Sequence, residues 1–412
     1  MLDHCNAPGL ISLEKAQALL QKHITPIKET VDRALAESLG FILADSVVSP
    51  VNVPSHDNAS MDGYAVRLTE LASEQALPVA GESFAGKPFT GTMPEGCCVR
   101  IMTGGCIPEG ADTVIMQEYA RKTPKGIQFT QWPDAAGASI RPMGDDIQCG
   151  ACIFKQGHKI KAQDIGLLAA MGVSTVSVFR PLKVAVFSTG DELRQPGEAL
   201  RYGEIYDSNR FAIKAMLSKM NSEVIDLGCI PDDPQRIREA LAQANEQADV
   251  VITSGGVSVG ESDYTRDALD EMGEVTFWKI AIKPGKPFTF GKLGDSVFFG
   301  LPGNPVSALV SFQQLAAPAL RVMMNMTTPP VREIQATCQT PLKKHPGRKE
   351  FQRGICEITD TGQITVSTTG GQCSGILHSM GVADCYIVLP EDNGGVHVGD
   401  SVAVQLFDEL LS

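Results

Sequence analysis

The chain has 412 residues and a mass of 44.0 kDa, a length that accommodates about two to four domains. Hydrophobic residues make up 43% of it and charged residues 20%, which excludes a disordered, collagen-like or coiled-coil chain. The 35 Lys and Arg against 48 Asp and Glu give a net charge of −13, which disfavours nucleic acid and anionic membranes as partners. An anionic ligand must therefore meet a local group of Lys and Arg.

The sequence predicts a cytoplasmic protein with free thiols. No run of about 18 apolar residues occurs, and the N-terminus opens with an acid and lacks the apolar core of a signal peptide. The 11 Cys fit a reducing compartment. Cys149 and Cys152 have redox or zinc spacing, but Cys97 and Cys98 are too close together to complete a zinc site. We interpret the pair as incidental thiols.

The first 180 residues predict two units, one inserted into the other. Residues 12–23 and 162–171 predict amphipathic helices. Between them, short strands alternate with Gly and Pro. We therefore expect a discontinuous N-terminal domain over 1–50 and 147–180, with helical and linker character, and a β-rich domain inserted over 51–146.

The pattern changes after Pro181. Residues 183–187 are a continuous apolar run, which is typical of a strand covered on both faces, and helices and strands alternate from there. This alternation predicts an open, mostly parallel α/β sheet over 181–328, with helices on both faces. Residues 329–412 predict a C-terminal β domain, so the whole chain is a multidomain α/β protein.

Four loops rich in Gly and Pro fall at the carboxyl ends of strands in the α/β domain, where ligands bind in open sheets. They span 188–192, 253–260, 283–287 and 301–305. Glycines let backbone N–H groups approach an anion closely, and lysines stand beside the loops, namely Lys279, Lys283 and Lys286. The alternative is a set of tight turns with a structural role.

Common phosphate and hydrolase motifs are absent from the sequence. The stretch 255–260 has GxxxxG spacing, but Glu261 and Ser262 replace the Lys-Ser/Thr pair of a P-loop, and no GxGxxG follows a strand. Triphosphate hydrolysis and dinucleotide chemistry are thereby disfavoured. No GxSxG or HExxH motif occurs either.

Acidic residues interleave with these loops, namely Asp191, Glu192, Asp232, Asp233 and Asp263. Carboxylates repel phosphates unless a hard cation such as Mg²⁺ bridges them, so the pattern predicts a Mg²⁺-dependent anion site. Alternatively, Asp232, Asp233 and Asp263 serve to begin the helices that follow them.

Polar loops also lie outside the α/β domain. In the inserted domain they are found at 57–64, 102–105 and 144–146, where they either carry function or form ordinary Asx turns. In the last domain, the basic cluster 343–349 with Arg353 is either a solvated face or the anion-attracting wall of the site.

A set of longer motifs resembles one known family. The sequence contains, in order, DNASMDGYAV, RIMTGG, VFSTGDEL, IYDSNR, TSGGVSVGESDYT, WKIAIKPGKPFTFG and GLPGNPVSA. These are similar to segments of the MoeA family of molybdopterin molybdenumtransferases, which includes the gephyrin E domain. The resemblance implies transfer of molybdenum from molybdate to adenylylated molybdopterin, with release of AMP. It also implies an elongated homodimer, in which the inserted domain of one subunit completes the cleft of the other.

The resemblance implies roles for the matching residues. For catalysis these are Asp62, Thr103, Asp146, Glu192 and Asp263. For substrate binding they are Ser188, Gly190, Asp232, Gly255, Gly256, Ser258, Lys279, Lys283, Pro302, Gly303 and Pro305, of which the two lysines and the glycines are assigned to pterin phosphate and adenylate. The resemblance also implies that Arg353 and Ser374 bind molybdate, and that Glu192, Asp263 and Asp232 bind Mg²⁺.

Two other classes use related sequences. The adenylyltransferase that activates molybdopterin resembles the α/β domain alone, so the two β domains disfavour it. A receptor-anchoring scaffold, as in gephyrin relatives, is disfavoured by the intact set of acids and lysines. For an enzyme of this family we expect transient contacts with the molybdopterin adenylyltransferase and with acceptor molybdoenzymes. Cys373, beside Ser374, has no role in this interpretation.

Overall fold

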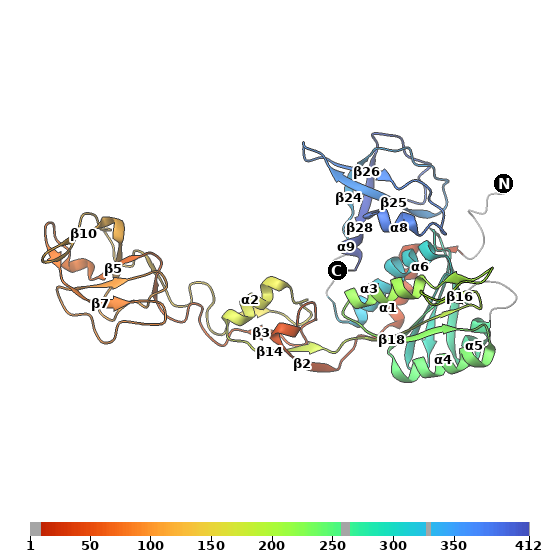
Figure 1. Cartoon of the computed structure of the whole chain (residues 1–412), viewed down its shortest axis with the longest axis horizontal. Coiled ribbons are helices and arrows are strands. Elements are labelled where there is room, and N and C mark those ends of the chain that lie inside the picture. Colours follow the sequence, from red (N-terminus) through yellow and green to blue (C-terminus); the bar gives the residue numbers. More distant parts are fainter. Residues whose placement is uncertain (1–9, 257–263, 327–330, 412) are drawn as a thin grey trace.

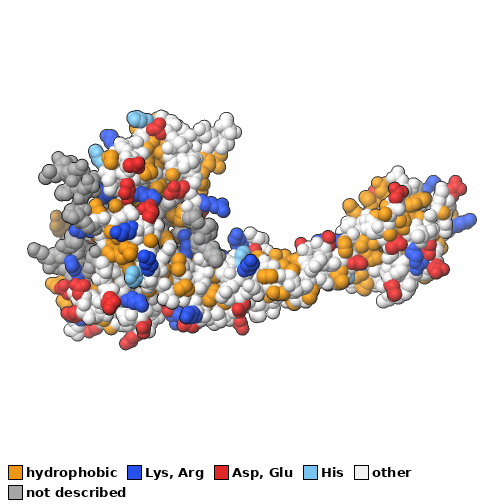
Figure 2. All heavy atoms as spheres, turned by 180° about the vertical axis from the view of Figure 1, so that it is seen from behind, with side chains coloured by type: hydrophobic (Ala, Val, Ile, Leu, Met, Phe, Trp, Pro, Cys, Tyr) orange, Lys and Arg blue, Asp and Glu red, His pale blue; other side chains and the backbone are white. Residues whose placement is uncertain are grey.

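The computed structural model describes residues 10–256, 264–326 and 331–411, and the molecule is elongated (Figure 1). An α/β unit and a C-terminal β unit form a bulky end, and a narrow stem connects this end to a β-rich tip. The same outline appears from behind in Figure 2, where acidic and basic side chains are interspersed over the bulky end. None of the described helices is long and apolar enough to cross a bilayer.

The α/β unit is built on a seven-stranded sheet. Its strands lie in the order β1 (Leu10–Ile11), β20 (Gly273–Ile280), β22 (Pro287–Leu293), β23 (Ser296–Leu301), β19 (Val250–Ser254), β15 (Lys183–Thr189) and β18 (Glu223–Ile230). β22 runs antiparallel to both of its neighbours, and the other pairings are parallel. The predicted open, mostly parallel sheet is therefore confirmed.

Helices cover both faces of this sheet (Figure 1). One core holds α1 (Leu13–His23), α3 (Asn209–Lys219), α6 (Pro305–Ser311) and α7 (Ala317–Met323). The other holds α4 (Pro234–Gln247) and α5 (Tyr264–Met272). Successive residues of β15 supply the two cores in turn, Val186 to the first and Phe187 to the second, because side chains alternate along a strand. A π-helical turn, Phe312–Ala316, joins α6 to α7.

The first described residues belong to the α/β unit and not to the N-terminal domain predicted over 1–50. β1 adds a parallel edge strand to β20, and Leu13 and Leu20 of α1 are buried in the α/β core. The predicted helix itself is confirmed, with Ser12 accepting a hydrogen bond from the amide of Lys15 at its start. Its assignment to a domain was wrong, because apolar spacing shows that a face is buried but not which core receives it.

The C-terminal unit is a closed sheet. Its order is β21 (Ile282–Lys283), β25 (Lys349–Ile358), β26 (Ile364–Thr368), β24 (Ile334–Cys338), β28 (Ser401–Leu406) and β27 (Cys385–Leu389), and β27 also pairs with β25. That last pairing closes five strands into a ring, while β21 links the ring to the α/β unit. Two short helices, α8 (His378–Val382) and α9 (Phe407–Leu410), stand where the sequence predicts β structure alone.

Two antiparallel passes of the chain form the stem. β2 (Thr30–Ala34) pairs with β14 (Thr175–Phe179), and β3 (Val47–Val48) pairs with β13 (Cys152–Phe154). The 3₁₀ turn Leu35–Glu37 and the helix α2 (Ala162–Ala170) pack in the same apolar cluster. The tip is thus inserted between the two passes.

The tip consists of small sheets. One has the order β7 (Val79–Ser83), β8 (Cys98–Ile101), β5 (Gly63–Val66) and β9 (Thr113–Met116). A second has β10 (Ala120–Thr123), β11 (Gly126–Phe129) and β6 (Ala76–Leu77), and β4 (Asn58–Ala59) pairs with β12 (Ile140–Arg141). The 3₁₀ turns Leu68–Glu70 and Gln117–Tyr119 join strands. Two apolar clusters form its core.

Candidate functional site

A cleft of about 830 Å³ opens at the carboxyl ends of β15, β19 and β23, the position at which open α/β sheets bind ligands. We call it the large cleft. It brings together many of the residues predicted from the sequence, namely Ser188, Gly190, Glu192, Asp232, Gly255, Gly256, Pro302, Gly303 and Pro305. Ser258 and Asp263 lie outside the described residues.

Gly255 and Gly256 form a wall of the large cleft from backbone alone. Both have positive φ angles, +92° and +62°, which residues other than glycine rarely adopt. A Cβ at Gly256 would lie 2.3 Å from Oγ1 of Thr265 and 2.8 Å from Oγ1 of Thr189. A side chain at this position would therefore collide with the wall, so glycine is required there.

Asn209 ties two loops of the large cleft together. Its Nδ2 donates hydrogen bonds to Oγ of Ser254 and to the carbonyl of Gly303, both at 2.8 Å. Among the described residues, its buried Oδ1 has no hydrogen-bond partner, and the same holds for Oγ1 of Thr189; both residues line the cleft. Buried polar atoms are normally hydrogen bonded, so these two atoms suit a ligand that carries N–H or O–H groups. Sequence reasoning included Thr189 only as part of the loop 188–192, and it missed Asn209, which lies in the IYDSNR motif.

A buried ion pair supports the floor of the large cleft. The guanidinium of Arg210, which is 2% exposed, donates from Nε to Asp207 at 2.8 Å and from Nη1 to Asp226 at 2.6 Å. Asp207 in turn accepts a hydrogen bond from the hydroxyl of Ser188 at 3.1 Å. This chain of contacts fixes the end of β15, where the predicted ligand-binding residues begin.

Carboxylates dominate one side of the large cleft. The amide of Asp232 donates to Oδ1 of Asp191 at 3.1 Å. Partial burial, the negative charge of Asp191 and that of Glu192 together raise the pKa of Asp232. Asp233 instead caps α4 by accepting from the amide of Arg236 at 2.9 Å, so the capping interpretation holds for Asp233 but not for Asp232.

These carboxylates suit a divalent cation. None of the described residues that line the large cleft is Lys or Arg, so an anion placed there would face uncompensated negative charge. Mg²⁺ commonly takes one or two protein carboxylates and completes its shell with phosphate and water. Glu192 and Asp232 fit this pattern. Among the described residues, no three metal-binding side chains of this cleft have their ligand atoms within 4.8 Å of one another.

A second, smaller cavity of about 250 Å³ lies between the α/β and C-terminal units, and we call it the basic cavity. Lys283, Lys343 and Arg353 line it together with Glu350. The Nζ of Lys283 lies 3.0 Å from Oε1 of Glu350. The basic cavity therefore carries more positive than negative groups.

Arg353 is the buried cation of the basic cavity. It is 1% exposed, and its Nε donates to Oγ of Ser379 at 3.0 Å while Nη2 donates to the carbonyl of Cys373 at 3.1 Å. Burial lowers the pKa of its guanidinium. Within the described residues, no carboxylate forms an ion pair with it, so a bound oxyanion would compensate its charge.

The two cavities are neighbours joined by one loop. At the start of α6, beside Pro305 of the large cleft, the amide of Val306 donates to the carbonyl of Ser374 at 3.1 Å. Two residues earlier, Gln372 lines the basic cavity and accepts from the amide of Arg353 at 2.7 Å. The loop 370–374 thus places Ser374 between the two cavities.

The predicted lysines do not gather around the glycine loops. Lys283 lines the basic cavity, whereas Lys279 is exposed on β20 opposite Pro287, a residue at the rim of the large cleft. Lys279 thus lies near the rim of the large cleft as expected, whereas Lys283 contributes its charge to the basic cavity instead. Their positions depend on the strand pairing of β20 and β21, which the sequence does not specify.

The acids predicted in the inserted domain lie in the tip, far from both cavities of the same chain (Figure 1). The amide and the hydroxyl of Thr103 both donate to Oδ1 of Asp62, at 2.8 and 2.7 Å, and these hydrogen bonds lower the pKa of Asp62. Asp146 is exposed, and its amide donates to the carbonyl of Val53. In the described part of the chain, no hydrogen bond joins Asp146 to Asp62 or Thr103.

Cys149 and Cys152 have separate partners. The thiol of Cys149 donates to the carbonyl of Pro50 at 3.4 Å, and that of Cys152 to the carbonyl of Phe154 at 3.6 Å. Neither belongs to a metal-binding cluster among the described residues.

Comparison with known proteins covers nearly the whole chain. Three family models match it: the MoeA N-terminal region (domain I and II) over 11–172, the probable molybdopterin binding domain over 185–322, and the MoeA C-terminal region (domain IV) over 335–407. A molybdopterin molybdenumtransferase of Haemophilus influenzae is 45% identical, with 98% of this chain and 100% of the relative covered. Molybdopterin molybdenumtransferase 2 of Mycobacterium tuberculosis is 32% identical, with 90% and 93% covered.

Solved structures agree with the sequence comparison. The crystal structure of the molybdopterin biosynthesis MoeA protein of Pyrococcus horikoshii matches with a TM-score of 0.82 and 29% identity, over 97% of this chain and all of the other. The fold and the large cleft define a multidomain protein with a candidate ligand site at the edge of an α/β sheet. The chain belongs to the MoeA family, which confirms the resemblance seen in its motifs.

Proposed function

We propose that this protein transfers molybdenum from molybdate to adenylylated molybdopterin, releasing AMP and forming molybdenum cofactor. Relatives that match 90% or more of the chain are named molybdopterin molybdenumtransferases. The observation that carries the proposal is the pair of adjoining cavities, one with a backbone wall and carboxylates and the other with a buried Arg353. The reaction needs two such places, since both of its substrates are anions.

The large cleft is the proposed site for the phosphates and the nucleotide. The backbone at Gly255 and Gly256 can approach phosphate oxygens closely, and Oδ1 of Asn209, which no described residue contacts by a hydrogen bond, accepts from a donor on the ligand. Mg²⁺, when bound, supplies the positive charge that the described lining of this cleft lacks. Glu192 and Asp232 would hold it, with Asp263 a further candidate from outside the described residues.

The basic cavity is the proposed site for molybdate. Arg353 and Lys283 offer positive N–H donors to a tetrahedral oxyanion. Ser374 lies in the loop between the two cavities, so it stands where molybdate would approach the pterin.

A direct assay tests the reaction. The purified full chain is incubated with adenylylated molybdopterin, Mg²⁺ and molybdate, and AMP release is followed together with activation of a cofactor-free molybdoenzyme. We expect molybdate-dependent AMP, and for Glu192→Gln a rate lower by about 10²–10³-fold. Glu246→Gln, on the exposed face of α4, is the matched control. Binding of the nucleotide without molybdate-dependent release of AMP would contradict the proposal.

We also propose that two copies share each site. Asp62 and Thr103 lie too far from the clefts of their own chain to take part there (Figure 1), so the tip of a second copy would bring them in. Mixing Glu192→Ala protein with Asp62→Asn protein tests this arrangement. If sites are shared, each mixed dimer has one site with both changes and one with neither, and about a quarter of all sites regain activity. If each site lies within one chain, Asp62 takes no part in it, so the Asp62→Asn protein is active on its own and mixing restores nothing.

A further inference from the structure

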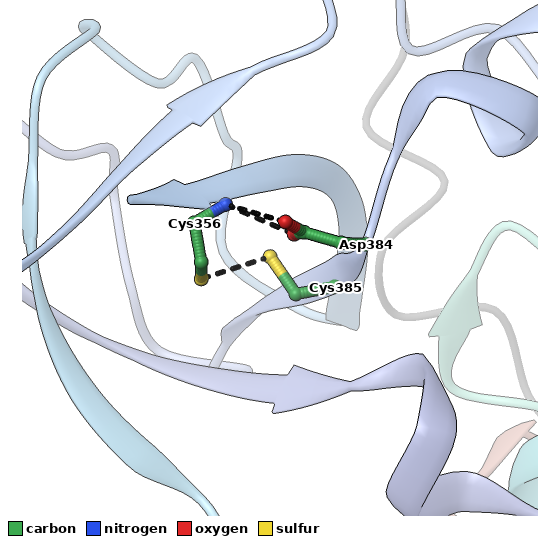
Figure 3. Close-up of side chains that lie close together, drawn as sticks. All are labelled: Cys356, Asp384 and Cys385. Carbon is green, nitrogen blue, oxygen red and sulfur yellow. Dashed lines mark hydrogen bonds between the residues drawn. The ribbon is translucent and has the colours of Figure 1, made fainter. Parts of the chain in front are cut away.

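Cys356 and Cys385 meet on neighbouring strands of the C-terminal sheet, outside both cavities (Figure 3). Cys385 pairs with Gly354 across β27 and β25, and Cys356 follows Gly354 by two residues, so the two side chains share a face. Their sulfur atoms lie 3.4 Å apart and share a hydrogen bond. A Cβ at Gly354 would lie 3.1 Å from the sulfur of Cys385, so glycine leaves the space in which the thiols meet.

The two thiols differ in access and in acidity. Cys385 is fully buried, whereas Cys356 is partly exposed. The hydrogen bond with Cys385 lowers the pKa of Cys356, and the same bond together with burial raises the pKa of Cys385. A partly exposed thiol with a lowered pKa, next to a buried second thiol, is the arrangement typical of cysteines that react with peroxides.

We infer that Cys356 and Cys385 form an oxidation site, at which a hydroperoxide converts the two thiols into a disulfide. The Cys356 thiolate attacks the peroxide, so an S–O bond forms, the O–O bond breaks and the leaving oxygen takes up a proton. The sulfur of Cys385 then attacks that of Cys356, forming the S–S bond and releasing water. In total, two thiols lose two electrons and two protons, and ROOH becomes ROH and water.

The geometry favours a disulfide over a metal ion. The sulfur atoms need to approach by roughly 1.4 Å to reach the bond length of about 2.0 Å. Asp384 is the third metal-binding group of the cluster, but its two oxygens already accept from the amide of Cys356, at 2.9 and 3.2 Å. The disulfide would tie β27 to β25, the strand that carries Arg353.

Peptide mapping of the full, chelator-treated protein tests the inference. Neither Lys nor Arg follows Arg353 in the chain, so trypsin alone leaves Cys356, Cys373 and Cys385 in one peptide. Cleavage before Asp as well separates them into 354–359, 360–383 and 384–391. After treatment with hydrogen peroxide we expect 354–359 linked to 384–391, about 2 Da lighter than the two thiols, and reversal by dithiothreitol.

Variants separate the two steps. In Cys385→Ala, Cys356 stops at the sulfenic acid, which dimedone traps, and in Cys356→Ala the buried Cys385 stays reduced. Asp384→Asn keeps an oxygen for the amide of Cys356 but removes a charge that raises the pKa of both thiols, so oxidation becomes about two- to fivefold faster. A purely structural role would give no such gain in rate, and this arm does not depend on the folding of the alanine variants.

Three outcomes would overturn the inference. In the first, the exposed Cys373 and Cys149 are oxidised while 354–359 and 384–391 stay reduced. In the second, Cys356 links to Cys373. In the third, one Zn²⁺ binds the chelated protein, Cys356→Ala abolishes that binding, and the metal-free thiols still form no disulfide.

Discussion

The large cleft and the basic cavity adjoin one another but carry opposite charges. The described lining of the large cleft includes Glu192, Asp207 and Asp232 without Lys or Arg, whereas the basic cavity contains the buried Arg353 beside Lys283 and Lys343. This difference in charge supports the proposal of two anions held by different means, one through backbone and a cation in the large cleft and the other through side chains in the basic cavity.

The backbone wall provides the test with the largest expected effect. In Gly256→Ala, the added methyl group meets Oγ1 of Thr265 and of Thr189, so the wall must move. We expect nucleotide binding to weaken by about 100-fold, equivalent to roughly 3 kcal/mol of overpacking. Titration with AMP in the presence of Mg²⁺ measures it. Gly362→Ala is the control, since its φ is also positive, at +79°, and no atom lies within 4 Å of the added carbon. Equal effects of the two changes would mean that strain at any glycine of this kind destabilises the protein generally, and that the wall of the cleft has no special role.

Arg353 tests whether the basic cavity acts on its own. Arg353→Lys keeps the charge but loses the fork of N–H donors. We expect the KM for molybdate to rise by about 10- to 100-fold, while the affinity for AMP changes little. Arg332→Lys, an exposed arginine ahead of β24, is the matched control. A parallel loss of AMP affinity would show that the two cavities work as one.

Substitution of Asp232 has the smallest expected effect. It should raise the stability of the free protein but lower its affinity for Mg²⁺. Because its pKa is raised in the folded protein, the folded state binds this proton more tightly than the unfolded state does. The free energy of unfolding therefore falls as the pH rises through the pKa of Asp232. Asp232→Asn should remove this loss and stabilise the free protein at pH 7 by a few tenths of a kcal/mol, while weakening Mg²⁺ binding.

Thermal melting with and without Mg²⁺ checks both signs for Asp232→Asn. Asp233→Asn serves as its neighbour control, because that residue caps α4 and asparagine caps equally well. A variant that melts lower than the native protein without Mg²⁺ would contradict the interpretation of Asp232.

Local patterns made much of the fold predictable. The helix α4 begins at Pro234 as its sequence indicates, because a capping Asp and a proline precede a regular apolar spacing. The glycine loops of the large cleft were predictable too, since strand ends and glycine requirements are encoded within a few residues. The separation of Lys283 from Gly255 was not, because it depends on the pairing of β21 with β25, a contact between residues far apart in sequence.

The sequence also did not predict which single polar groups are buried. Nothing in the sequence around Arg353 distinguishes a buried guanidinium from the solvated basic cluster beside it. Its burial results from the closure of the C-terminal ring through β25 and β27. The Oδ1 of Asn209 likewise lacks a partner in the described part of the chain because two acceptors from separate loops fix its amide group.

The pairing of Val48 with Cys152 in the stem makes the tip a removable part of the chain. Since these two residues are neighbours across two strands, a short turn in place of residues 49–151 would close the chain with little loss of entropy. Such a shortened chain would keep the core of the α/β unit, to which the stem and tip contribute little. The shortened protein should bind the nucleotide ligand as the full chain does. It should turn over only when a second, intact copy supplies its tip to the site.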